Sequence, residues 1–369
     1  MAFAQRKALM GRVESLRPGR RLICFCNFDR QSSQGCQGLT THMAEDAKEP
    51  LYRTLKEAGI GGGTGLDLLL YTRGGDTNSV WPLVSLIREF DPDFEVLVPF
   101  RCHSAGTMLA LAAKRIHMTR IGELSPIDPT VGNAFNPPDP TDPKRRALIS
   151  VEDVKAFEEF VAETLTGEQV IPKEARSAAL SPFLHVLVQQ VHPLALGNVR
   201  RLTKLSELLA GMLLEFRWPD EAERNEIVTT LIRKYGSHSH MISRAEAAAI
   251  LGEEHVAFAS RELDAALDAL LRRYEDDFHL REPFLAADHI GDDLEKPCRF
   301  IGAVIECRTW GYVYETEAAM RQYSVSPEGV PIQMPPGSAP GLVPGFKRGY
   351  DVQVRTMRWA RNKRPRGHQ

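Results

Sequence analysis

One serine of this chain lies where an apolar strand-like run gives way to a stretch typical of a helix. Ser104 follows Glu95–Phe100 and precedes a segment rich in alanine and leucine that starts at Ala105. A serine in such a turn presents its hydroxyl at a helix N-terminus, where unpaired backbone N–H groups and the helix dipole favour negative charge. A tetrahedral intermediate carries that charge on its oxyanion. The sequence therefore indicates that Ser104 is a nucleophile.

A second donor to such an oxyanion must come from a turn without a side chain in the way. The pair Gly74-Gly75 ends the apolar run Leu66–Thr72, and glycine permits a close approach of the backbone. A serine before a helix is by itself often only an N-cap, and a Gly-Gly pair after a strand is often only a turn. Their combination predicts that Ser104 Oγ lies in a cleft near the Gly75 N–H.

The elements that position these residues alternate between strand and helix. We expect strands at 22–28, 66–72 and 95–100, and helices at 43–58, 80–90 and 105–116. Such alternation implies right-handed βαβ units, a parallel sheet and an α/β fold. Chemistry in these folds gathers at the carboxyl ends of the strands, where both turns are predicted to lie.

The remainder of the chain is predicted to be mainly helical and then β. A loop rich in Pro, Asp and Gly at 123–143 leads to helices at 150–164, 181–190, 194–216, 220–235, 244–250 and 257–274. Strands are expected at 300–316 and 352–359, joined by a Pro/Gly-rich link, and they should pair with each other or extend a sheet edge. We expect two units, a catalytic domain with a helical extension (1–280) and a β-rich appendage with a basic tail (281–369).

Composition restricts the classes of partner. The net charge of −2 provides no global field for nucleic acid, and the basic C-terminus is interpreted as a solvated tail. No run approaches the roughly 20 apolar residues that cross a bilayer, and the N-terminus lacks a signal-peptide core, so we expect a cytoplasmic protein. The cysteines and histidines show no recognisable zinc spacing, and no metal or cofactor is expected. The cysteines are Cys24, Cys26, Cys36, Cys102, Cys298 and Cys307.

Several segments resemble the serine dehydrogenase proteinase family, relatives of signal peptide peptidase A and, more distantly, of the Clp protease. The most specific are LDLLLYTRGGD (66–76), PFRCHSAGTMLALAA (99–113) and GELSPIDPTVG (122–132). The resemblance continues through ISVEDVKAF (149–157) and SHSHMISRAEA (237–247), and it covers most of residues 20 to 275.

This resemblance implies a Clp-protease/crotonase-like spiral core of βαβ units, with an added helical layer and a small C-terminal β segment. It also implies ATP-independent hydrolysis of peptide bonds in a polypeptide substrate through an acyl-enzyme at Ser104. The backbone N–H groups of Gly75 and Ala105 would form the oxyanion hole, with Gly74, Ser125 and Asp128 at the substrate. Proteins of this fold commonly form homo-oligomers, so a trimer or hexamer is expected.

The general base is left open between a lysine and a histidine. Where Clp-type enzymes place their catalytic histidine, this sequence has the segment from Ser125 to Pro129, which contains none. Relatives of signal peptide peptidase A use a lysine, and Lys144 lies at the end of the proline-rich loop, with Lys155 as a weaker alternative. A lysine base must be held neutral, by desolvation or by neighbouring positive charge.

Histidines are the competing candidates for the base. His238 and His240 lie in a segment that the resemblance covers, and the pKa of imidazole is already near neutral pH. The alternative is that both are structural residues of a loop between helices. His103 directly precedes the nucleophile and is expected to point away from it, and Asp128 could orient a base.

Two other functions are compatible with the same turn. Crotonase-like sites use paired N–H donors to stabilise a thioester enolate, but acyl-CoA chemistry of that kind needs no serine there. A non-catalytic scaffold could retain the turn for its backbone geometry alone. A fluorophosphonate probe that labels the wild type and not Ser104→Ala would support only the peptidase.

Overall fold

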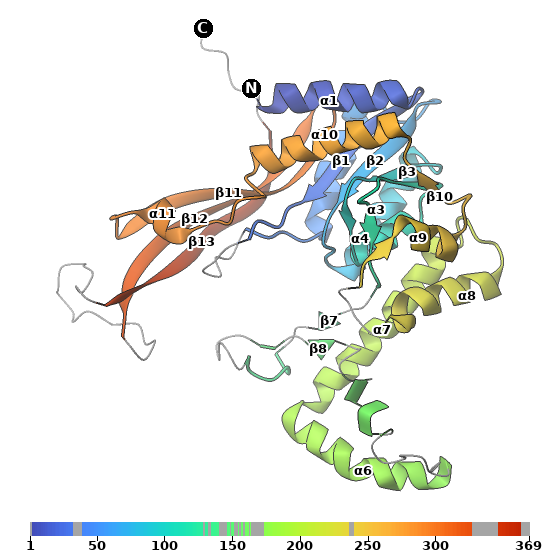
Figure 1. Ribbon diagram of the computed structural model, residues 1–369, viewed down its shortest axis with the longest axis vertical. Helices are drawn as coiled ribbons and strands as arrows, with labels where there is room; N and C mark the ends of the chain where they lie inside the picture. The colour runs from blue at the N-terminus through green and yellow to red at the C-terminus, as the bar shows by residue number, and fades with distance from the viewer. Residues whose placement is uncertain are drawn as a thin grey trace.

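The computed structural model describes residues 2–31, 39–127, 130–131, 134–139, 146–147, 149–150, 154, 156–157, 159–161, 163, 173–235, 240–326 and 346–362. Its centre is an eight-stranded sheet in the order β10-β5-β3-β2-β1-β11-β12-β13 (Figure 1). The strands from β10 to β1 are mutually parallel, and β11, β12 and β13 continue the sheet in antiparallel fashion. In chain order these strands are β1 (Arg20–Asn27), β2 (Gly65–Tyr71), β3 (Glu95–Val98), β5 (Arg115–Met118), β10 (Val256–Phe258), β11 (Glu295–Glu306), β12 (Gly311–Val325) and β13 (Lys347–Arg361).

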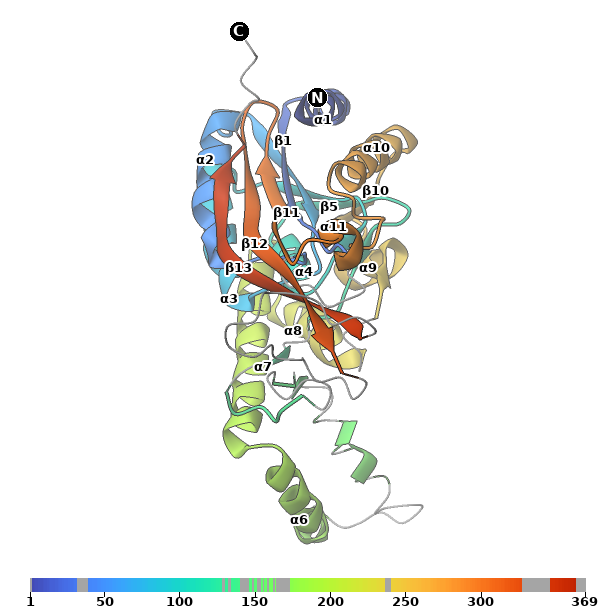
Figure 2. The same ribbon diagram turned by 90° about the vertical axis from the view of Figure 1, so that its left-hand side faces the viewer.

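Helices cover both faces of the parallel part of the sheet. Helices α1 (Ala2–Leu16) and α10 (Arg261–Asp277) lie on one face, while α2 (Lys48–Ala58), α3 (Thr77–Phe90) and α4 (Ala105–Leu111) lie on the other (Figure 2). The residues of β1 alternate between the two cores, because successive side chains of a strand point to opposite faces. Ile23 and Phe25 are buried on the α2–α3 side, and Leu22 and Cys24 on the α1–α10 side.

Shorter elements build the edge of the sheet where the parallel strands end. Strands β4 (Arg101–Cys102), β6 (Glu123–Leu124) and β9 (Ile242–Ser243) form a three-stranded sheet, and β7 (Thr130–Val131) pairs with β8 (Ile149–Ser150). The other helices are η1 (Glu45–Ala47), α6 (Lys173–Gln190), α7 (Pro193–Leu214), α8 (Glu221–Thr229), the π-helical η2 (Thr230–Lys234), α9 (Arg244–Leu251) and α11 (Ala286–Ile290). Helices α7 and α6 extend away from the sheet (Figure 1).

The α/β class and the βαβ units expected from the sequence are confirmed. The units β1–α2–β2 and β2–α3–β3 each join neighbouring parallel strands, and α4 leads from β4 to β5. A helical layer follows in α6 to α9. The C-terminal strands pair with one another and also continue the main sheet, because β11 bonds to β1. Within the described residues, no helix is both long and apolar enough to span a membrane.

Three predicted elements differ from the structure. The helix expected at 105–116 ends at Leu111, and Arg115 already begins β5. The helix expected at 257–274 starts only at Arg261, because the preceding residues form β10 at the sheet edge. The strand expected at 300–316 is two strands with a turn at 307–310. Both helix errors arise where alanine, a strong helix former, lies in or beside a short strand that tertiary pairing stabilises.

Candidate active site

Ser104 is held in an unusual backbone conformation directly before α4. It is the N-cap residue, with φ 51° and ψ −111°, and its side chain makes no capping hydrogen bond. Among the described residues, His279 is the only other non-glycine residue with positive φ. Such conformations cost about 1–3 kcal/mol and cluster at functional sites. The surrounding contacts must therefore enforce the geometry of Ser104.

Gly74 packs directly against this serine. Its φ is +106°, and a Cβ at this position would lie 2.8 Å from Ser104 Cβ and 3.3 Å from Ser104 Oγ. The Gly74 N–H donates to Thr72 Oγ1 at 3.0 Å. The turn after β2 and the turn before α4 are therefore in contact, and only glycine leaves room for the serine.

Gly75 is constrained by a different neighbour. A Cβ there would lie 2.1 Å from the Met43 carbonyl oxygen. Met43 and Gly75 form a parallel bridge, in which the Met43 N–H donates to Gly74 O at 2.9 Å and the Asp76 N–H donates to Met43 O at 2.8 Å. Neither hydrogen bond uses the Gly75 N–H, so this bridge does not occupy the donor that an oxyanion would need.

Ser125 supports the backbone of the nucleophile turn. Its Oγ accepts from the Ser104 N–H at 2.8 Å and donates to the Pro126 carbonyl at 3.0 Å, and the residue is 2% exposed. Thr107 of α4 accepts from the Ser125 N–H at 3.1 Å. The expected role of Ser125 was substrate binding. Because this hydroxyl both accepts and donates within the protein, we propose instead that Ser125 positions the Ser104 turn.

A charged cluster lies beside the same turn. His103 Nε2 shares a hydrogen bond of 2.9 Å with Glu123 Oε1, and Arg101 Nε lies 3.7 Å from that oxygen. Arg73 and Arg101 also pair with Asp29. Burial raises the pKa of Glu123 above its usual range, and the charges of Arg101 and Arg73 offset this effect only in part. The cluster places protonatable groups next to Ser104.

Glu123 is not among the site residues predicted from the sequence. Glu123 and Ser125 are two positions apart where the chain passes through β6, and both side chains bond to the 103–104 turn. Alternation along a strand places such residues on one face. The two-residue spacing of Glu123 and Ser125 is the signal that could have indicated Glu123. It is weak, because β6 is only two residues long and its sheet partners come from distant segments.

His240 is the one candidate base within the described residues. Its Nε2 lies 3.2 Å from Glu246 Oε1, and its ring stacks on Tyr235 at 4.2 Å between centroids. Tyr235 also donates to Glu246 at 2.8 Å. Two residues further on, Ile242 pairs with Leu124, the neighbour of Ser125. The other candidates, Asp128, Lys144, Lys155 and His238, lie outside the described residues.

A small cavity lies beside the segment that contains Met43. Its volume is about 150 Å³, and its lining includes His42, Ala44, Asn27, Tyr314 and Trp359. Burial lowers the pKa of His42 below its usual range, and the nearby charge of Asp29 offsets this effect only in part. The cavity thus adjoins the backbone that bonds to Gly74, and its far wall comes from the C-terminal strands β12 and β13.

Comparisons with known proteins place these features in context. No family model matches the chain. It is 31% identical over 106 residues to the uncharacterized protein MJ0137 of Methanocaldococcus jannaschii, which covers 28% of this chain and 36% of that relative's length.

Solved structures that resemble the chain include two of the same protease. One is a serine-to-alanine mutant of the 1510-N membrane-bound stomatin-specific protease, with a TM-score of 0.36 and 15% identity, covering 60% of this chain and 78% of that one. The other is a lysine-to-alanine mutant of 1510-N in complex with a substrate peptide, with a TM-score of 0.37 and 14% identity, covering 60% and 74%.

Proposed function

We propose that this protein is a serine peptidase that hydrolyses polypeptides through an acyl-enzyme at Ser104. The observation that carries the proposal is the strained Ser104 turn packed against Gly74 at the start of α4. An N-cap serine that only terminates a helix would bond to its own helix and adopt an ordinary extended conformation. Ser104 does neither, and its Oγ lies 3.3 Å from the position that a Cβ of residue 74 would occupy.

In the proposed reaction, Ser104 Oγ attacks the carbonyl carbon of the scissile peptide bond. The backbone N–H groups of Gly75 and Ala105 donate to the oxyanion, where an aligned donor contributes roughly 3 kcal/mol. Collapse of the intermediate expels the amine and leaves the acyl-enzyme, which water then hydrolyses. Ser125 and Thr107 fix the Ser104 backbone, so that the hydroxyl is already oriented before the substrate binds.

For the general base, we propose His240 as the first candidate, oriented by Glu246. The support is its hydrogen bond to Glu246 and the pairing of β9 with β6, which brings its segment to the strand beside Ser125. A base oriented by a carboxylate is the arrangement that activates many serine nucleophiles. Lys144 and His238 remain alternatives, because a lysine in a desolvated loop can perform the same proton transfer.

Hydrolysis of an unfolded polypeptide tests the proposal. We expect the wild type to release peptides and Ser104→Ala to lose at least about a thousandfold in rate, since removal of the nucleophile leaves only binding and oxyanion contacts. Ser15→Ala is a matched control, because Ser15 lies on α1 and bonds only within its helix. Equal rates for wild type and Ser104→Ala would refute the peptidase.

The pH dependence of kcat/KM distinguishes the bases. If a histidine is the base, the rate should fall as the pH drops through about 6.5, and Lys144→Arg should be nearly silent. If Lys144 is the base, Lys144→Arg should abolish turnover, because arginine does not lose its proton in proteins. For the His240 assignment, Glu246→Gln should change the pH profile, whereas Glu254→Gln, an exposed control, should not. An unchanged profile in Glu246→Gln would remove His240.

A further inference from the structure

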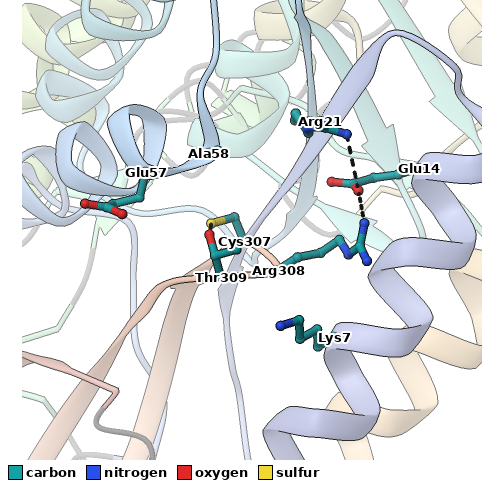
Figure 3. Close-up of a pocket in the computed structure, with 8 residues that line it drawn as sticks. All are labelled: Lys7, Glu14, Arg21, Glu57, Ala58, Cys307, Arg308 and Thr309. Carbon is teal, nitrogen blue, oxygen red and sulfur yellow. Dashed lines mark hydrogen bonds and ion pairs between the residues drawn. The ribbon is translucent and has the colours of Figure 1, made fainter.

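A larger cavity lies at the opposite end of β1 from the candidate active site. Its volume is about 390 Å³, and it is bounded by α1, the end of α2 and the turn between β11 and β12 (Figure 3). Arg21, near the start of β1, lines it, whereas the Ser104 turn lies at the carboxyl edge of the parallel strands. The two sites are therefore separate.

One buried carboxylate of this cavity is shared by two arginines. Glu14 is 8% exposed in its side chain, and it accepts from Arg308 at 3.0 Å and from the Leu22 N–H at 3.0 Å. Arg21 lies 3.9 Å from the same carboxylate, and the two arginine side chains are 54% and 45% exposed. The buried carboxylate thus lies between two guanidinium groups (Figure 3). Each guanidinium has five N–H donors, which one shared carboxylate cannot occupy.

Gly11 and Lys7 complete the wall formed by α1. A Cβ at Gly11 would lie 3.2 Å from Arg308 Cζ, so the guanidinium packs against the helix at this glycine. Lys7 precedes Gly11 by one helical turn and lies on the same face. Figure 3 shows its ammonium group directed toward the Cys307–Arg308 turn. Lys7 makes no ion pair with any residue that the structure describes.

We propose that this cavity binds a small molecule that bears a phosphate group. Its lining contains two guanidiniums, one ammonium and the Thr309 hydroxyl, and such donors match the oxygens of a phosphate. The volume leaves room for a small body beyond the phosphate. None of the described residues that line the cavity is aromatic, which argues against a nucleobase. Glu57 on the opposite wall is exposed, and Figure 3 shows its carboxylate turned away from Lys7 and Arg308.

Titration calorimetry of the full chain with inorganic phosphate and with pyrophosphate tests this site, at constant ionic strength set with chloride. We expect Lys7→Gln and Arg308→Gln each to weaken binding roughly five- to tenfold, because each removes a charge-assisted hydrogen bond. Glu57→Gln should strengthen binding, because it removes a repelling carboxylate. Arg12→Gln, on the exposed side of α1, is the matched control and should bind as the wild type does.

A second variant distinguishes a loss of binding from a folding defect in Arg308→Gln. Arg21 is 54% exposed and lies 3.9 Å from Glu14, so Arg21→Gln should weaken phosphate binding while the thermal midpoint is retained. Equal binding in the wild type, Lys7→Gln and Arg21→Gln would overturn the site. Succinate binding as tightly as phosphate would overturn the assignment to phosphate. Neither result depends on peptidase activity.

Discussion

At the scale of single residues, Ser104 and Gly74 depend on each other. The serine adopts its positive φ in a space that only a glycine leaves open, and Ser125 fixes the same backbone from the other side. The strain is therefore maintained by contacts from two other segments of the chain. A serine oriented in this way does not have to be reorganised when a substrate binds.

Gly74→Ala should therefore impair the activity of the site more strongly than it lowers the free energy of unfolding. Its Cβ would push on Ser104 Cβ and Oγ, and we expect kcat/KM for polypeptide hydrolysis to fall about a hundredfold or more. Gly62→Ala is the matched control, because Gly62 also has positive φ but has no atom within 4 Å of its Cβ position. Rates and urea unfolding should be measured for both. Similar losses of activity in the two variants would show that backbone strain, and not the contact with Ser104, causes the effect.

The sequence predicted a serine turn and a glycine turn at the ends of neighbouring strands, because both follow directly from local patterns. It did not predict the partners that support them. Glu123 and Ser125 bond to residues 103 and 104 through a two-residue strand, and His240 approaches through β9 from more than a hundred residues away. Local propensity carries no information on such pairings.

At the scale of elements, the opposite ends of β1, β2 and β3 are joined by charged residues. Asp67 accepts from Arg17 at 2.8 Å and from Arg20 at 2.5 Å, and Glu95 pairs with Arg17 and His117 at 2.5 Å each. These contacts connect the residue that follows α1 with the four neighbouring strands β1, β2, β3 and β5. Burial raises the pKa of Glu95, but its hydrogen bonds to His117 and Arg17 prevail and lower it to about 2.

This pKa makes the stability of the protein depend on pH in acid. Glu95 has an unfolded pKa near 4.5, so its contribution is complete above that value and is lost as the pH falls from about 4.5 to about 2. The full shift corresponds to roughly 3 kcal/mol. Urea unfolding between pH 7 and pH 2 should show a weaker pH dependence for Glu95→Gln than for the wild type. Parallel curves for the two proteins would exclude this role of Glu95.

Sequence patterns predicted most elements because hydrophobic runs and turn residues are local. Strands β1, β2 and β3 and helices α2 and α3 lie close to their expected positions. Helix α1 was not predicted, because it alternates charged and apolar residues without a strong apolar stripe, and its burial depends on α10. The helices predicted at 105–116 and 257–274 extend into the short strands β5 and β10, which are stabilised by pairing with distant segments: β5 pairs with β3 and with β10.

At the scale of the whole molecule, the C-terminal strands are joined to the N-terminal half. Strand β11 pairs with β1 from Cys24 to Asn27. Glu306 at the end of β11 is fully buried, and it accepts from Arg6 of α1 at 2.7 Å and from Tyr274 of α10 at 2.7 Å. The main sheet is thus continuous across the boundary expected at residue 280.

This pairing changes the expectation for a shortened chain. If residues 281–369 were only an appendage, as the sequence predicts, truncation at Arg281 would leave the core folded. The structure leads us to expect that residues 1–281 lose several kcal/mol of stability, because Arg6 loses Glu306, one of its two buried partners, and the edge of β1 is exposed. Urea unfolding of this fragment, with full-length Glu306→Gln for comparison, measures the loss. A cooperative transition at the wild-type midpoint would restore the view of the C-terminal segment as an appendage.

The most direct test of the central claim is the site at which a fluorophosphonate probe attaches. Intact-mass measurement and peptide mapping of the full chain should show one adduct, on Ser104, because its hydroxyl is proposed to be the activated one. Ser104→Ala should remain unmodified, and Gly74→Ala should react much more slowly. Labelling of another serine, or no labelling of the folded wild type, would contradict the assignment of Ser104 as the nucleophile.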